Sequence, residues 1–73
     1  MEQYVIHYTV EIAGHLVAQG NLADHMWSTL QACKDYIAGS DPYWLQAKEW
    51  LAQMAGPHAT INYECISSHS QSL

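Results

Sequence analysis

Residues 4–22 read YVIHYTVEIAGHLVAQGNL, and this stretch decides the fold. From Tyr4 to Ile12, every second residue is a large apolar or aromatic one. This period of two is typical of a β-strand that turns one face toward a core. The residues from Leu16 to Leu22 alternate in the same way. The stretch therefore predicts two consecutive strands that pair as a hairpin.

The length of the loop between these strands sets their register, because a slip of one residue moves every side chain to the other face. A two-residue loop at Ala13 and Gly14 places polar Glu11 opposite apolar Leu16. We therefore expect a three-residue loop that also includes His15, which avoids this mismatch. The facing pairs are then Ile12 with Leu16, Val10 with Ala18, Tyr8 with Gly20 and Ile6 with Leu22. Two of these four pairs, at Ala18 and Gly20, set a large residue over a small one.

The next apolar residues recur at the spacing of a helix. Either Asn21 or Asp24 can cap its start, and Gly39 suits the position just after its end. We therefore expect an amphipathic helix of about four turns. Its apolar face would carry Ala23, Met26, Leu30, Cys33 and Ile37.

A second helix and a third strand follow. Ser40 or Asp41 can cap this helix, and Pro42 fits its first turn because a missing N–H costs nothing there. The expected apolar stripe, which ends before Gly56 and Pro57, consists of Trp44, Ala47, Leu51 and Met54. A period of two returns from His58 to Ile66 and predicts the third strand.

The predicted order is ββααβ. It describes an α+β domain in two layers, with a three-stranded, mainly antiparallel sheet covered on one face by an antiparallel helical hairpin. We expect residues 1–66 to form this single domain and residues 67–73 to form a flexible polar tail. The expected core consists of Ile6, Tyr8, Val10, Leu30, Cys33, Trp44, Leu51, Ile61 and Tyr63. The other face of the sheet is expected to be open, and it would carry Val5, His7, Thr9, Glu11, Val17, Gln19, Thr60, Asn62, Glu64 and Ile66.

The charge balance argues against nucleic-acid binding. The 73 residues include seven acids and only two basic residues, Lys34 and Lys48, and no arginine. Affinity for nucleic acid comes largely from lysine and arginine that neutralise phosphates. No apolar run approaches the roughly 18 residues of a membrane span, and the first residues lack the basic region of a signal peptide. We therefore expect a cytoplasmic protein with neither a nucleic acid nor a membrane as its direct partner.

The cysteines and histidines give no recognisable site. Cys33 and Cys65 both fall on inward faces, and in a reducing compartment we expect free buried thiols, with a bridge between them as the alternative. The five histidines lack the spacing of a zinc site, so we expect no metal and no cofactor. The chain also lacks a glycine-rich phosphate loop, and a two-layer domain of this size leaves little room for a walled active site. We therefore expect no enzymatic activity.

The aromatic residues point to a contact surface instead. The chain has three tryptophans and five tyrosines but no phenylalanine, and tryptophan and tyrosine are enriched at binding hot spots. The residues one step off the main helix stripes, with one acidic neighbour, form the candidate partner site: Tyr43, Trp50, Glu49 and Trp27. The alternative site is on the open sheet face, at Val5, His7, Val17, Glu64 and Ile66.

These features favour a small non-enzymatic protein-binding module. In its general profile, a tiny acidic α+β chain without arginine or phenylalanine, the protein is similar to phage and mobile-element accessory proteins, including anti-CRISPR and other anti-defence inhibitors. The resemblance implies an inhibitor of a bacterial nucleoprotein machine whose groove is basic. Two alternatives from other classes are a self-associating structural domain that forms a homodimer and a small hydrolase or nuclease that uses histidine and cysteine.

Overall fold

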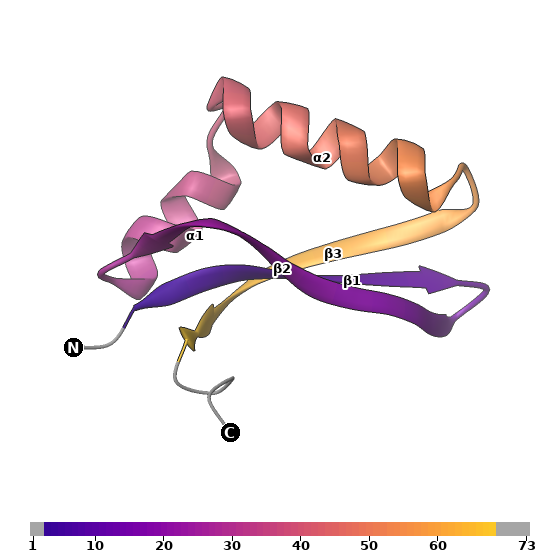
Figure 1. The fold of residues 1–73 in the computed structure, drawn as a ribbon, viewed down its shortest axis with the longest axis horizontal. Coiled ribbons are helices and arrows are strands. Elements are labelled where there is room, and N and C mark those ends of the chain that lie inside the picture. Colours follow the sequence, from indigo (N-terminus) through magenta and orange to yellow (C-terminus); the bar gives the residue numbers. More distant parts are fainter. Residues whose placement is uncertain (1–2, 69–73) are drawn as a thin grey trace.

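The computed structural model describes residues 3–68, and at positions 23 and 24 it describes the backbone. The elements are β1 (Tyr4–Ile12), β2 (His15–Trp27), α1 (Leu30–Ala38), α2 (Pro42–Ala55) and β3 (Ala59–Ser67). The strands form one antiparallel sheet in the order β2-β1-β3, and both helices lie on one side of it (Figure 1). The expected class, α+β with an antiparallel sheet and two helices, is confirmed. Of the expected polar tail, Ser67 closes β3, and residues 69–73 lie outside the described part.

The β1–β2 hairpin keeps most of the expected register. Val10 faces Ala18, Tyr8 faces Gly20 and Ile6 faces Leu22. A Cβ atom at Gly20 would lie 2.9 Å from the hydroxyl oxygen of Tyr8. The absence of a side chain at position 20 therefore makes room for the Tyr8 ring.

The tip of the hairpin differs from the prediction. The turn has two residues, Ala13 and Gly14, whose φ angles are 53° and 80°. Two positive φ values give the backbone twist that suits a two-residue hairpin loop. Ile12 therefore faces His15 rather than Leu16, and Leu16 faces Glu11. The register shifts between Val10 and Glu11, so that Val17 is the extra residue of a β-bulge.

The start of α1 also differs from the prediction. Residues 21–27 continue β2 rather than opening the helix, and Trp27 pairs with Tyr4 of β1. Neither Asn21 nor Asp24 is the N-cap. That position belongs to Thr29, whose Oγ1 accepts a hydrogen bond of 3.1 Å from the N–H of Ala32. Strand pairing holds this segment extended although its apolar residues have helical spacing.

The second helix begins and ends as expected. The carboxylate of Asp41 caps its start, Pro42 occupies the first turn, and Gly56 follows the last turn with a φ of 95°. The expected antiparallel packing of the two helices is not observed. Figure 1 shows α1 and α2 at a wide angle, joined by a short connection in which Gly39 has extended backbone angles.

The core lies between the sheet and the two helices. Ile6, Cys33 and Trp44 form its buried centre, and Val10 and Leu51 are also buried. Partly buried side chains that pack against the centre are Tyr4, Leu22, Trp27, Tyr36, Ile37, Tyr63 and Cys65. Tyr8 and Ile61, both expected in the core, are partly buried as well.

Several expectations about burial are wrong. Met26 and Met54, both expected on apolar helix faces, are 52% and 66% exposed. Leu30 is 38% exposed, because it opens α1 at the edge of the layer instead of lying in the middle of a longer helix. Val5, expected on an open sheet face, is only 4% exposed, because it lies on the central strand and pairs with Ile66 of β3.

The expectation of two free thiols is also wrong. Cys33 of α1 and Cys65 of β3 form a disulfide, and their Cα atoms are 6.1 Å apart. The inward position of both cysteines, which suggested buried thiols, is also what brings them together. The bond ties the helical layer to an edge strand of the sheet.

Candidate functional site

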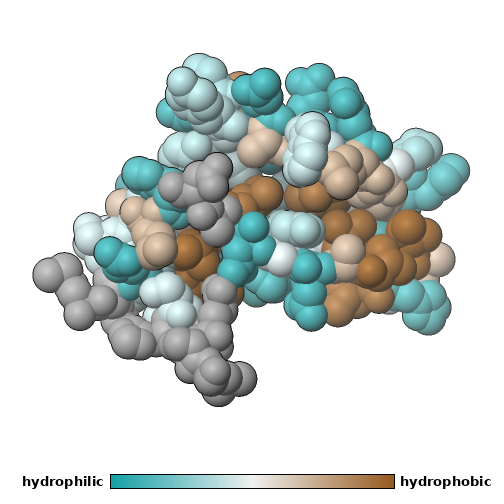
Figure 2. All heavy atoms as spheres, in the orientation of Figure 1, coloured by the Kyte–Doolittle hydropathy of each residue, from teal (hydrophilic) through white to brown (hydrophobic). Residues whose placement is uncertain are grey.

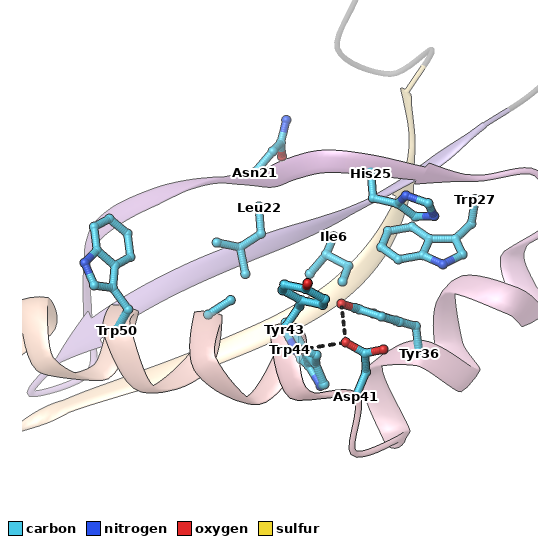
Figure 3. A pocket seen from close by; sticks show the side chains of 11 residues that line it. Ile6, Asn21, Leu22, His25, Trp27, Tyr36, Asp41, Tyr43, Trp44 and Trp50 are labelled. Atoms are coloured by element: carbon cyan, nitrogen blue, oxygen red, sulfur yellow. Dashed lines mark hydrogen bonds between the residues drawn. The ribbon is translucent and has the colours of Figure 1, made fainter.

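A cleft opens between α2 and the sheet. α1 packs against all three strands, whereas the main contact of α2 is with β3, at the far edge from β2. The space left on the β2 side has a volume of about 740 Å³, which lies in the usual range of about 300 to 1,000 Å³ for ligand sites. It is lined by Ile6, Asn21, Leu22, His25, Trp27, Tyr36, Asp41, Tyr43, Trp44, Ala47 and Trp50 (Figure 3).

Aromatic side chains from three elements form much of the wall of this cleft. Trp27 of β2 contacts Tyr36 of α1, with ring centroids 4.9 Å apart, and Tyr36 contacts Trp44 of α2 at 5.9 Å. His25 extends the row with an edge contact to Trp27 at 4.8 Å. Because each ring is held by its neighbour, this wall is preformed rather than assembled by a ligand.

Trp44 anchors the row to the core. Its side chain is buried, and its indole N–H donates a hydrogen bond of 2.9 Å to the carbonyl oxygen of Ile37. One side of its ring meets Tyr63 of β3 edge-on, at 4.9 Å. The ammonium of Lys48 lies 5.1 Å from the Trp44 ring centroid, a cation–π distance. Trp44 therefore belongs to the framework of the cleft.

Tyr43 and Trp50 form the exposed rim. They are 79% and 58% exposed, although both are large aromatic side chains. Seven residues apart on α2, they lie along the same side of the helix. Figure 3 shows Trp50 at one end of the cleft and His25 with Trp27 at the other. The rim can therefore contact a bound segment along the length of the cleft.

One carboxylate lies among these rings. Asp41 Oδ1 accepts a hydrogen bond of 2.9 Å from the N–H of Tyr43 and a longer one of 3.5 Å from the hydroxyl of Tyr36. The side chain is exposed at the surface of the cleft. Burial, followed by the charge of Asp41 and this hydrogen bond, raises the pKa of the Tyr36 hydroxyl above its usual value. The Asp41 carboxylate therefore makes this end of the cleft electronegative.

The structure brings together three of the four residues of the sequence-based candidate site. Tyr43, Trp50 and Trp27 all line the cleft, whereas Glu49 lies outside it and accepts a hydrogen bond from Gln53. Trp27 lines the cleft from the end of β2, although it was expected on a helix. Sequence reasoning did not assign the other lining residues to a site. The cap signal at Asp41 was recognised, but nothing in the sequence placed this carboxylate beside Tyr36.

The alternative site on the opposite face is less continuous. Val5 is buried, and the Nδ1 atom of His7 lies at hydrogen-bond distance, 2.9 Å, from the side-chain oxygen of Asn21. Ile66 is partly buried, while Val17 and Glu64 are exposed. A partner on this face would meet isolated apolar side chains rather than a continuous apolar surface.

Among the side chains that the structure describes, which leave out those at positions 23 and 24, no group of three or more histidines, cysteines, aspartates or glutamates could hold a metal ion. No helix within residues 3–68 is long and apolar enough to cross a membrane. The lining of the cleft offers apolar and aromatic contact around the carboxylate of Asp41, with Asn21 and His25 as further polar side chains.

Comparisons with protein-family models, curated proteins and solved structures gave no match to this chain.

Proposed function

We propose that the protein is a small non-enzymatic binding module that takes a segment of a partner protein into the cleft between α2 and β2. The observation that carries this proposal is the exposure of Tyr43 and Trp50 at the rim of a preformed aromatic cleft. Burying such side chains against a partner removes a large apolar area from water, and tryptophan and tyrosine are frequent hot spots.

The uneven distribution of apolar residues supports the proposal. In the described part of the chain, six hydrophobic side chains are buried and nine large ones are exposed. Figure 2 shows apolar residues gathered near the β1–β2 turn, where Ile12, Leu16 and Val17 are exposed. Exposed apolar side chains in this number are typical of a protein that binds another one. Among the nine, Tyr43 and Trp50 line the cleft, whereas the patch near the turn lies outside it.

The charge of the chain favours a basic partner. Seven acids oppose two lysines, which gives a net charge of −5 at pH 7. Charge complementarity speeds association and selects among partners. One specific form of the proposal is therefore an inhibitor that occupies the basic groove of a bacterial nucleoprotein machine, as anti-defence proteins do.

The disulfide bears on the cellular compartment in which the protein acts. Disulfides persist in oxidising compartments and are rare in the cytoplasm. The cytoplasmic location expected from the sequence requires the domain to fold with Cys33 and Cys65 reduced. The bond between these residues favours an oxidising setting instead, so an inhibitor of a nucleoprotein machine is the form of the proposal that requires a stable reduced domain.

The test is affinity capture with the wild-type protein and two variants. Trp50→Ala removes an exposed aromatic of the cleft rim, and Val17→Ser removes an exposed apolar residue outside the cleft. A protein retained by the wild type is identified and purified, and its affinity for each variant is then measured by calorimetry. We expect Trp50→Ala to weaken binding by about 2 kcal/mol or more, whereas Val17→Ser keeps wild-type affinity.

The controls are a thermal melt of each variant and a salt series. Both variants should melt like the wild type, since the two side chains are exposed, and binding should weaken as salt rises. Loss of binding in Val17→Ser with full binding in Trp50→Ala would contradict the cleft proposal and favour the opposite face.

A homodimer is the second candidate, and the edge of β2 favours it. This strand of 13 residues has no lysine and no proline, which often protect an edge strand from pairing with another chain. Two copies could pair edge to edge through β2, although a charge of −5 on each opposes association. Sedimentation at several protein concentrations tests this, and a dimer that Val17→Ser dissociates supports the second candidate.

A further inference from the structure

The polar end of the cleft suggests what the bound segment carries. Asp41 is the only acidic residue among the described residues that line the cleft, and no lysine or arginine lines it. The chain has no arginine at all, and Lys48 lies at the ring of buried Trp44 without lining the cleft. The Asp41 carboxylate is therefore not matched by a cation of its own chain within the described lining.

The surroundings of this carboxylate suit a guanidinium group. The rings of Tyr36 and Tyr43 lie beside Asp41 in Figure 3, and both of its hydrogen bonds end on Oδ1. Among the described residues, no hydrogen bond to Oδ2 accompanies them. Arginine combines a planar cation that stacks on aromatic rings with N–H groups that match a carboxylate, whereas the ammonium of lysine is a compact and strongly hydrated charge.

The partial positive charge at the N-terminus of α2 does not cancel the preference of the Asp41 carboxylate for a cation. The N-terminus of a helix carries a partial positive charge of roughly one half, which is less than the full negative charge of the carboxylate. The raised pKa of Tyr36, to which Asp41 contributes, agrees with a negative potential at this point. The rest of the lining, including Ile6, Leu22, Ala47 and Trp50, offers apolar contact to the residues next to the cation.

We infer that the cleft recognises an arginine side chain of the partner segment, held by Asp41 and the rings of Tyr36 and Tyr43, with an apolar neighbour packed toward Trp50. This inference rests on the proposed function and names the chemistry of the partner. It also names one acidic residue, Asp41, as the group that contacts the cation of the partner.

The test uses two blocked peptides that differ in one group. The first is acetyl-Leu-Gly-Arg-amide, and the second replaces arginine by citrulline, which has nearly the same shape without the charge. Binding of each to the oxidised full chain is followed by NMR, through the backbone amide signals and the two indole N–H signals of Trp27 and Trp50. We expect both signals to shift and the arginine peptide to bind about tenfold more tightly than the citrulline peptide.

The variant Asp41→Asn separates charge from structure. Asparagine caps a helix about as well as aspartate, so α2 should keep its N-terminus while the charge is lost. Asp35→Asn is the matched control, since it removes one acidic charge from α1 outside the cleft. The preference for arginine should fall to within about twofold in Asp41→Asn and stay near tenfold in Asp35→Asn.

Three results would overturn the inference. Equal affinity for the two peptides, with both indole signals shifting, would refute the arginine site while the cleft remained a peptide-binding site. An arginine preference that survives in Asp41→Asn would refute the role of this carboxylate. Shifts confined to β3 and the opposite sheet face would refute both the arginine site and the cleft.

Discussion

Cys33 of α1 and Cys65 of β3 are joined by a disulfide, so the first helix is bonded to the strand that follows the second helix. The bond closes a segment with a sequence separation of 32, which contains the rest of α1, all of α2 and the start of β3. α2, which forms one wall of the cleft, lies inside this closed segment. The geometry of the candidate site and the oxidation state of the protein are therefore linked.

Reduction should destabilise the domain by about 3 to 4 kcal/mol, the chain-entropy value for a closed loop of this length. A core of this size typically leaves only about 3 to 5 kcal/mol of net stability. A denaturant melt with and without reductant measures the difference. A double variant, Cys33→Ala with Cys65→Ala, is the control, because reductant should leave its melt unchanged. Equal wild-type melts under both conditions would contradict a stabilising disulfide.

Two leucines test where the core ends. Leu51 is buried, so Leu51→Ala should cost about 2 to 5 kcal/mol of unfolding free energy. Leu30 is 38% exposed at the start of α1, and Leu30→Ala should cost only about 1 kcal/mol. Urea melts of the two variants give both values. Equal losses would place Leu30 in the core, as the longer helix predicted from the sequence requires.

The contact between Gly20 and Tyr8 should appear as a coupling energy. A Cβ at position 20 would lie 2.9 Å from the Tyr8 hydroxyl oxygen and 3.1 Å from its ring, so Gly20→Ala forces the ring to move. We expect a cost of about 1 to 3 kcal/mol in the wild type and almost none in a Tyr8→Ala background. A double-mutant cycle from denaturant melts measures this coupling. Additive effects would contradict the register of the hairpin.

Alkaline pH should destabilise the fold through two tyrosines. Burial raises the pKa of Tyr63, and burial together with the Asp41 carboxylate raises that of Tyr36. Each hydroxyl therefore keeps its proton more tightly in the folded state than in the unfolded chain, where the pKa is about 10. Their contribution is fully present below pH 10 and is lost as the pH rises through the folded-state values.

The check is the unfolding free energy as a function of pH, with phenolate absorbance as a second signal. Tyr36→Phe should reduce the alkaline loss of stability, because it removes one of the two hydroxyls whose pKa is raised. An unchanged alkaline loss in Tyr36→Phe would contradict the influence of Asp41 and burial on this hydroxyl.

The alternation of apolar and polar residues predicted the strands of the hairpin, and the capping residues predicted the ends of the second helix. Three facing pairs of the hairpin and both ends of α2 follow from the residue pattern alone, because facing side chains must fit and helix ends need particular residues. The tip of the hairpin does not follow in this way. The β-bulge at Val17 shifts the register by one residue, so that a two-residue turn is compatible with the facing pairs further along the strands. A bulge depends on the pairing of both strands, which the local sequence does not determine.

Long-range contacts account for the other differences. The segment before Thr29 has helical spacing, but pairing of Trp27 with Tyr4 keeps it in β2. The cleft depends on where α2 comes to lie over the sheet, and no local pattern encodes that position. Sequence reasoning could therefore select Tyr43, Trp50 and Trp27 as unusual, but not the carboxylate and rings that surround them.

Site-specific photocrosslinking tests the role of the cleft most directly. A benzoylphenylalanine replaces Tyr43 at the rim or, as the control, Glu64, which is exposed on β3 outside the cleft. Each protein is irradiated with the purified partner, and excess unlabelled wild-type or Trp50→Ala protein serves as competitor. We predict a crosslinked adduct from position 43 and none from position 64. Excess wild-type protein should suppress the adduct from position 43, whereas excess Trp50→Ala protein should not. An adduct from position 64 without one from position 43 would contradict binding in the cleft.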